Sequence, residues 1–149
     1  MQVSDNFDIR EFVHPDVWNE YGEKSVWFVN RKLILCDQAL RDRYGLTMIN
    51  NWHYFHEDLW YSRKRVNSGF NLNRDIGADY SMHKLGLASD SIYKDVTADE
   101  VREDILKHEK FWLDMGLTTL ESGDFAKTWV HKDTRYTGLD YIFIVEPEK

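Results

Sequence analysis

Two short polar segments, far apart in the chain, constrain the fold most strongly because they carry metal-ligand side chains. Residues 81–90 read Ser-Met-His-Lys-Leu-Gly-Leu-Ala-Ser-Asp, and residues 129–133 read Trp-Val-His-Lys-Asp. Two imidazoles and one carboxylate at His83, Asp90 and His131 can close on a single zinc ion and leave a fourth position open for water or substrate. A fold that uses them in this way must bring the two segments together.

Strand alternation decides which side chains around His131 share a face. In an extended segment Trp129, His131 and Asp133 point to one side of the strand. Val130 and Lys132 point to the other side. If Val130 is buried, the opposite face presents an imidazole flanked by an indole and a carboxylate, so we expect the metal on an exposed sheet face.

Small residues and the single cysteine narrow the choice of metal site. Gly86 and Ala88 leave room for the backbone to turn between His83 and Asp90, so that both side chains can reach one ion. Cys36 is the only cysteine, which excludes an internal disulfide and a thiolate cluster. Any metal must therefore be held by histidine and carboxylate, and we expect Cys36 in the core.

Length and composition indicate one packed domain over residues 1–149. Of the 149 residues, 42% are hydrophobic and 15% are aromatic, which is typical of a globular protein. The net charge of −7 and the scattered Lys and Arg argue against nucleic acid as a partner. The chain starts without a basic and apolar leader and has no run of about 18 apolar residues, so we expect neither an export signal nor a membrane span.

The first half of the chain shows a helical pattern, a short strand and a long segment without a period. Apolar side chains recur at three- and four-residue steps and predict a helix over residues 26–44, with Gly45 as its C-cap. Residues 46–50 have the composition of a strand. Residues 51–80 lack a period, and we interpret them as a long functional loop.

The second half begins with a helix whose start and stop are both visible in the sequence. Thr97 and Glu100 form a capping box, and Gly116 ends the helix. The spacing places His108 on the same face as the apolar Trp112. We therefore expect one helix that packs its apolar face on a sheet.

Two strand-like segments follow, at residues 129–134 and 141–145. The connection between them contains Gly138, as expected of a hairpin loop, so we expect these strands to form an antiparallel pair. The predicted architecture is α+β, a small antiparallel sheet backed by two main helices.

The two motifs together resemble those of a known enzyme family. Ser-x-His-x-x-Gly-x-Ala-x-Asp at residues 81–90, followed by Trp-Val-His-x-Asp at residues 129–133, resembles the zinc D-alanyl-D-alanine carboxypeptidase-like peptidases. That family includes phage endolysins that cut the peptide stems of peptidoglycan, and it shares the hedgehog/DD-peptidase fold. Residues 47–52 and 68–70 also look like the family's N-terminal half.

The resemblance implies that His83, Asp90 and His131 bind Zn²⁺ and that the bound water is the nucleophile. Such a mechanism needs a carboxylate to move the water proton to the leaving amine. Many members place this acid three residues before the second histidine, where this chain has Thr128. Glu121 is then our first candidate for the base. Two carboxylates remain as alternatives, Asp133, which is also a candidate orienting residue, and Asp124.

Substrate contacts are expected from residues around the two motifs. We assign substrate binding to Ser81, Trp129 and Arg65, since a guanidinium captures a carboxylate in bidentate fashion. The arginine that the family places after Ser-Gly-Phe is Asn71 in this chain. A second metal site at two further histidines is a separate hypothesis, for His53 and His56.

The expected function is that of a zinc metallopeptidase that hydrolyses a bond in the stem peptide of bacterial peptidoglycan, of the L-alanyl-D-glutamate or D-alanyl-D-alanine type. We expect a monomer that is made in the cytoplasm without its own signal peptide and acts at the cell wall, in phage lysis or as a virion component. The alternative is a non-catalytic, zinc-containing cell-wall-binding or phage structural domain of the same fold.

Overall fold

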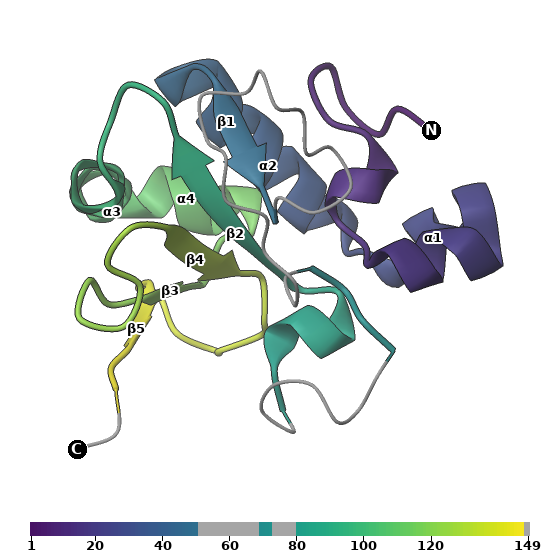
Figure 1. Cartoon of the computed structure of the whole chain (residues 1–149). Helices are drawn as coiled ribbons and strands as arrows, with labels where there is room; N and C mark the ends of the chain where they lie inside the picture. Colours follow the sequence, from purple (N-terminus) through teal and green to yellow (C-terminus); the bar gives the residue numbers. More distant parts are fainter. Residues whose placement is uncertain (51–68, 73–79, 148–149) are drawn as a thin grey trace.

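The computed structural model describes residues 1–50, 69–72 and 80–147. Within these residues the protein combines four α-helices with one five-stranded sheet, in agreement with the expected α+β class (Figure 1). The elements in chain order are η1 (Ile9–Glu11), α1 (Pro15–Tyr21), η2 (Gly22–Phe28), α2 (Arg31–Tyr44), β1 (Thr47–Ile49), η3 (Met82–Leu85), β2 (Ala88–Tyr93), α3 (Ala98–Lys107), α4 (Glu109–Met115), β3 (Thr119–Glu121), β4 (Val130–Asp133) and β5 (Phe143–Val145), where η denotes a 3₁₀-helix.

The end of the first predicted helix is confirmed, whereas its start was wrong. Helix α2 ends at Tyr44, and Gly45 follows with a φ of 80°. It begins only at Arg31, because the Asn30 side chain accepts a hydrogen bond from the Lys32 amide and caps the helix there. Val29 is extended and buried, so its apolar character serves tertiary packing, not a longer helix.

The predicted capping box is confirmed, but the helix that it opens is split. The Thr97 hydroxyl accepts from the Glu100 amide, and the Glu100 carboxylate accepts from the Thr97 amide. At His108 the backbone leaves helical geometry (φ −114°, ψ 32°), which separates α3 from α4. The two helices therefore differ in direction, and the His108 side chain is 43% exposed while Trp112 is buried. The placement of His108 on the apolar face was wrong, and the stop at Gly116 is confirmed.

The strand order is β1-β2-β4-β3-β5, and the sheet is mixed (Figure 1). Strands β1, β2, β4 and β3 pair antiparallel along this order, whereas β5 pairs with β3 in parallel. The predicted antiparallel pair of the last two strands and the purely antiparallel sheet were therefore wrong. Strand β4 already has β2 and β3 as its two neighbours, so β5 cannot pair with β4 and instead joins the sheet at the edge of β3.

Helices α2, α3 and α4 cover one face of the sheet (Figure 1). Buried apolar side chains from these helices and from the sheet form one core, with Cys36, Leu40, Val101, Ile105, Trp112, Leu120 and Val130 among them. The burial of Cys36 and Val130 confirms both expectations. A second cluster joins the N-terminal segment and α1 to α2. None of the helices in the described part of the chain combines the length and apolar character needed to cross a membrane.

Candidate metal centre

The register of β2 on β4 brings two of the candidate ligands together. Asp90 of β2 lies directly opposite His131 of β4 in the antiparallel ladder. Residues in directly opposite positions project to the same face. This is the face that α2, α3 and α4 leave uncovered, because Val130 packs in the core on the helix side. Asp90 and His131 therefore lie on the sheet face opposite the helices, as strand alternation predicts.

His83 reaches the same point from the short helix η3, which precedes β2. The chain leaves η3 at Gly86, whose φ is +66°, in the left-handed region. A Cβ atom at Gly86 would lie 1.7 Å from the carbonyl oxygen of Phe28. The Gly86 carbonyl in turn accepts a hydrogen bond of 2.9 Å from the Asn30 amide. Only glycine fits this turn, which agrees with the role expected of Gly86 between His83 and Asp90.

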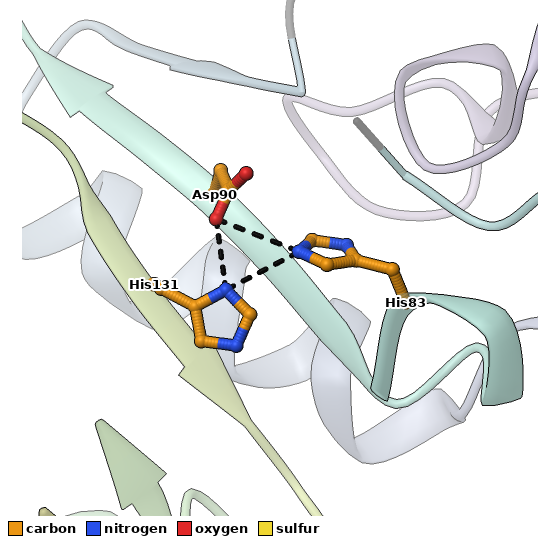
Figure 2. A group of neighbouring side chains, drawn as sticks. All are labelled: His83, Asp90 and His131. Atoms are coloured by element: carbon orange, nitrogen blue, oxygen red, sulfur yellow. Dashed lines mark hydrogen bonds and ion pairs between the residues drawn. The ribbon is translucent and has the colours of Figure 1, made fainter. Parts of the chain in front are cut away.

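Three ligand atoms converge in this arrangement (Figure 2). The Nε2 atom of His83 lies 3.2 Å from Nδ1 of His131 and 3.6 Å from Oδ1 of Asp90, and the latter two atoms are 2.9 Å apart. Zinc bonds of about 2.0–2.1 Å at tetrahedral angles separate ligand atoms by about 3.3 Å. The three distances bracket this value, so the residues fit a metal ion held by all three.

Proton counting supports a cation at this point. Nδ1 of His131 lies within hydrogen-bonding distance of both the Asp90 carboxylate and the His83 imidazole, yet it carries at most one proton. If both imidazoles instead donate to Asp90, their two N–H groups lie side by side with the nitrogen atoms only 3.2 Å apart, which is unfavourable. A metal ion in the centre accepts a lone pair from each of the three atoms at once.

The charges of the site are strongly coupled. Burial alone raises the pKa of Asp90, but the charges and hydrogen bonds of His83 and His131 outweigh it and hold the pKa well below its usual value. For His131, burial lowers the pKa, and the hydrogen bond and charge of Asp90 more than compensate, so the pKa is raised. The centre thus favours a carboxylate anion beside positive charge, which is what a metal ion would provide.

The two leading candidates for the base flank the other nitrogen of His131. Oε1 of Glu121 and Oδ2 of Asp133 each lie 3.9 Å from Nε2 of His131. Asp133 is fully buried, and Arg135 donates to both of its carboxylate oxygens, at 2.9 and 3.0 Å from Nε. Glu121 is partly exposed, and burial raises the pKa of its carboxyl group. Asp133 is therefore held in an ion pair, whereas Glu121 is better placed to exchange a proton.

The other predicted site residues are less closely tied to the centre. Ser81 stands before η3, where its carbonyl accepts from the Lys84 amide at 3.0 Å. Trp129 precedes β4, is partly buried, and its carbonyl accepts from Arg102 at 2.9 Å. Asp124 is exposed after β3. Three predicted residues, Arg65, His53 and His56, lie outside the described residues, as does most of the predicted loop over residues 51–80.

Asn50 supports the site, and sequence reasoning missed it. It follows β1 with a φ of 51°, which asparagine tolerates better than most residues. Its Oδ1 atom accepts from the Asp90 amide at 3.1 Å, and its own amide donates to the Asp90 carbonyl at 2.9 Å. Its Nδ2 atom donates to the carbonyl of Glu11. An asparagine directly after a strand was the available signal.

Comparison with known proteins adds no relative: no protein-family model, curated protein or solved structure matches the chain. The function is therefore inferred from the two motifs and from the geometry of the three converging side chains.

Proposed function

We propose that the protein is a zinc metallopeptidase that hydrolyses a peptide bond in the stem peptide of bacterial peptidoglycan. The observation that carries this proposal is the convergence of His83 Nε2, Asp90 Oδ1 and His131 Nδ1 within 3.6 Å of one another. Three protein ligands are the number found in catalytic zinc sites, which keep a fourth position for water.

These three residues would hold the zinc ion, and the rest of the site would handle protons. When bound, zinc lowers the pKa of its water toward neutrality and polarises the carbonyl group to be attacked. Asp90 brings one negative charge, so the occupied site would keep a net charge of about +1. His131 would keep its ring orientation through the Asp133 carboxylate beside Nε2, an arrangement that strengthens histidine as a ligand.

Glu121 is the residue that we propose as general base and acid. Its burial raises the pKa of the carboxyl group, and the neighbouring charges of His131, Asp90 and His83 all act on it. A carboxyl group with a raised pKa takes up a proton more readily and returns it to a leaving amine. Asp133 is held by Arg135, which suits it to orienting His131 instead.

The substrate and the setting follow from the same motifs. We propose the hedgehog/DD-peptidase fold, a stem peptide of the L-alanyl-D-glutamate or D-alanyl-D-alanine type as substrate, and a monomer that acts at the cell wall in phage lysis or within a virion. Ser81, Trp129 and Arg65 remain our candidates for contacts to that peptide.

Glu121→Ala tests the proposed reaction. We expect the variant to bind zinc as the wild type does and to release amines from purified peptidoglycan about 10²-fold more slowly, the scale of a lost general base. Glu103→Ala is the matched control, since Glu103 is an exposed glutamate of α3, which covers the other face of the sheet, and it should keep full activity. Mass spectrometry of the released muropeptides identifies the bond. Near-wild-type turnover of Glu121→Ala would remove this residue from the mechanism.

A non-catalytic zinc domain that binds the cell wall is the second candidate. The observation in its favour is Thr128, an exposed residue without a titratable group at the position where many members of the resembled family carry their acid. Wild-type protein that contains zinc but releases no amines from peptidoglycan would support this second function over the first.

A further inference from the structure

A second charged cluster lies on the opposite face of the strands that carry the metal centre. Asp37 of α2 and Lys132 of β4 form an ion pair of 2.6 Å between Oδ1 and Nζ, and both side chains are 0% exposed. Lys132 directly follows His131, so strand alternation turns it toward α2 while His131 faces the metal centre. The proposed reaction makes no use of this pair.

Two serines of β2 complete the cluster. Ser89 donates to Oδ2 of Asp37 at 2.7 Å, and Ser91 donates to Oδ1 at 3.3 Å. Lys132 also donates to the hydroxyl of Ser91. The two serines flank Asp90 in the sequence, as Val130 and Lys132 flank His131. One helix carboxylate is thus bonded to both strands, on either side of the position where Asp90 faces His131.

This arrangement distinguishes between registers that the apolar pattern cannot separate. A slip of β2 on β4 by one residue would turn every side chain to the wrong face. A slip by two residues preserves the faces and keeps apolar side chains in the core. It would, however, shift Ser89 and Ser91 relative to Lys132, and it would move Asp90 away from His131.

We infer that Asp37 and Lys132 are positioning residues of the metal centre, which hold β2 and β4 in the register that sets Asp90 opposite His131. The inference depends on the metal centre in the proposed function and not on peptide hydrolysis. A positioning role can be separated from a purely stabilising one by experiment, because a buried ion pair can often be replaced by apolar side chains without loss of stability.

The test is the double variant Asp37→Leu with Lys132→Met, which removes both charges and retains side-chain volume. We expect a folded protein whose zinc affinity, measured by competition with a chelator, is about tenfold or more weaker, as for residues that orient metal ligands. The matched control removes the partly exposed Arg43–Asp104 ion pair, which joins α2 to α3. Arg43→Gln with Asp104→Asn should leave zinc affinity unchanged.

A second measurement needs no metal. In the metal-free wild type we expect one set of cross-strand nuclear Overhauser contacts, which pairs Asp90 with His131. The double variant should lose these contacts or show a second register. Wild-type zinc affinity and an unchanged Asp90–His131 pairing in the double variant would overturn the inference. A wild type that binds no zinc would instead refute the metal centre, and the metal-free pairing would still decide the role of Asp37 and Lys132.

Discussion

The two faces of the β2–β4 ladder carry charged clusters of opposite character. On the helix side, Lys132 and Asp37 neutralise each other, and two serines bond to the same carboxylate. On the other side, two imidazoles and the Asp90 carboxylate point at one another around a common centre (Figure 2). The first cluster is held together by its own ion pair and hydrogen bonds, whereas the second also places its three ligand atoms in a geometry that fits a cation.

The contrast between the two clusters separates charges with a structural role from charges with a functional role. Charges that are fully buried and mutually bonded contribute to a defined register. Nitrogen and carboxylate atoms that converge on one point indicate a ligand. Nε2 of His83 and Nδ1 of His131 illustrate this, because they lie 3.2 Å apart and both face Oδ1 of Asp90. A metal ion between these atoms would bind all three.

The largest effect is expected from removing a ligand on the metal side. His131→Ala should lose stoichiometric zinc and all measurable hydrolysis, because two remaining ligands hold the ion poorly and metal binding contributes to folding. Metal analysis of the purified variant and its thermal unfolding with and without zinc check this. A variant that retains one equivalent of zinc would show that the two faces do not differ as described.

On the helix side, the single variant Lys132→Met should be strongly destabilising. It leaves the Asp37 carboxylate buried with only serine partners, and an unpaired buried charge costs about 3–5 kcal/mol. Urea unfolding of the zinc-free protein measures the loss. The variant with both Asp37→Leu and Lys132→Met should recover most of it, and a loss below about 1 kcal/mol in the single variant would contradict the paired-charge account.

Glycine is required at residue 86 for two reasons, its positive φ and the close approach of the Phe28 carbonyl oxygen. Gly86→Ala tests the second reason. The methyl group would overlap the Phe28 carbonyl oxygen, and the backbone would also be strained, so we expect a loss of about 3 kcal/mol and weaker zinc binding. Gly45→Ala is the control, since it shares a positive φ but has nothing within 4 Å of the added carbon. Gly45 has a φ of 80° and a ψ of −149°, so the control should lose about 1–3 kcal/mol through backbone strain alone and keep its zinc affinity. Unchanged zinc affinity in Gly86→Ala would argue against the close contact at Gly86.

The smallest effect concerns Glu11, whose pKa is raised in part by the charge of Asp37 in the helix-side cluster. Burial, with a contribution from the charge of Asp37, raises the pKa of Glu11 from 4.5 to about 7. Its contribution to stability is therefore fully present below pH 4.5 and is lost as the pH rises through 7. Glu11→Gln cannot ionise and should be about 2 kcal/mol more stable than the wild type at pH 8, with no gain at pH 4.

The control for Glu11 is the other capping-box glutamate. Hydrogen bonds from Thr97 lower the pKa of the exposed Glu100, so Glu100→Gln should show no gain in stability at pH 8. Urea unfolding at the two pH values measures both variants. A Glu11→Gln variant that gains equally at pH 4 and pH 8 would show that ionisation is not the cause.

Local signals predicted the parts of the fold that local chemistry determines. The capping box at Thr97, the stops at Gly45 and Gly116, and the outward and inward alternation of His131 and Lys132 all depend on a few neighbouring residues. The three candidate ligands were predicted from the resemblance of two motifs to those of a zinc peptidase family. Their convergence in space is consistent with that prediction.

Long-range pairing explains what the sequence did not reveal. The partner of β5 depends on which strand edges are free after β4 has bound β2 and β3. The residues near Gly138 do not indicate this partner. The break between α3 and α4 at His108 is not marked by a glycine or a proline in the sequence. Asn50 and Asp37 act through contacts with Asp90, Ser89 and Lys132, which are distant in sequence.

Anomalous scattering at the zinc edge from crystals of the zinc-loaded protein would locate the metal ion. We predict one peak at about 2.0–2.2 Å from Nε2 of His83, Oδ1 of Asp90 and Nδ1 of His131, with a fourth position open to solvent. Absence of a peak among these three atoms, or a zinc ion bound only elsewhere, would contradict the metal centre.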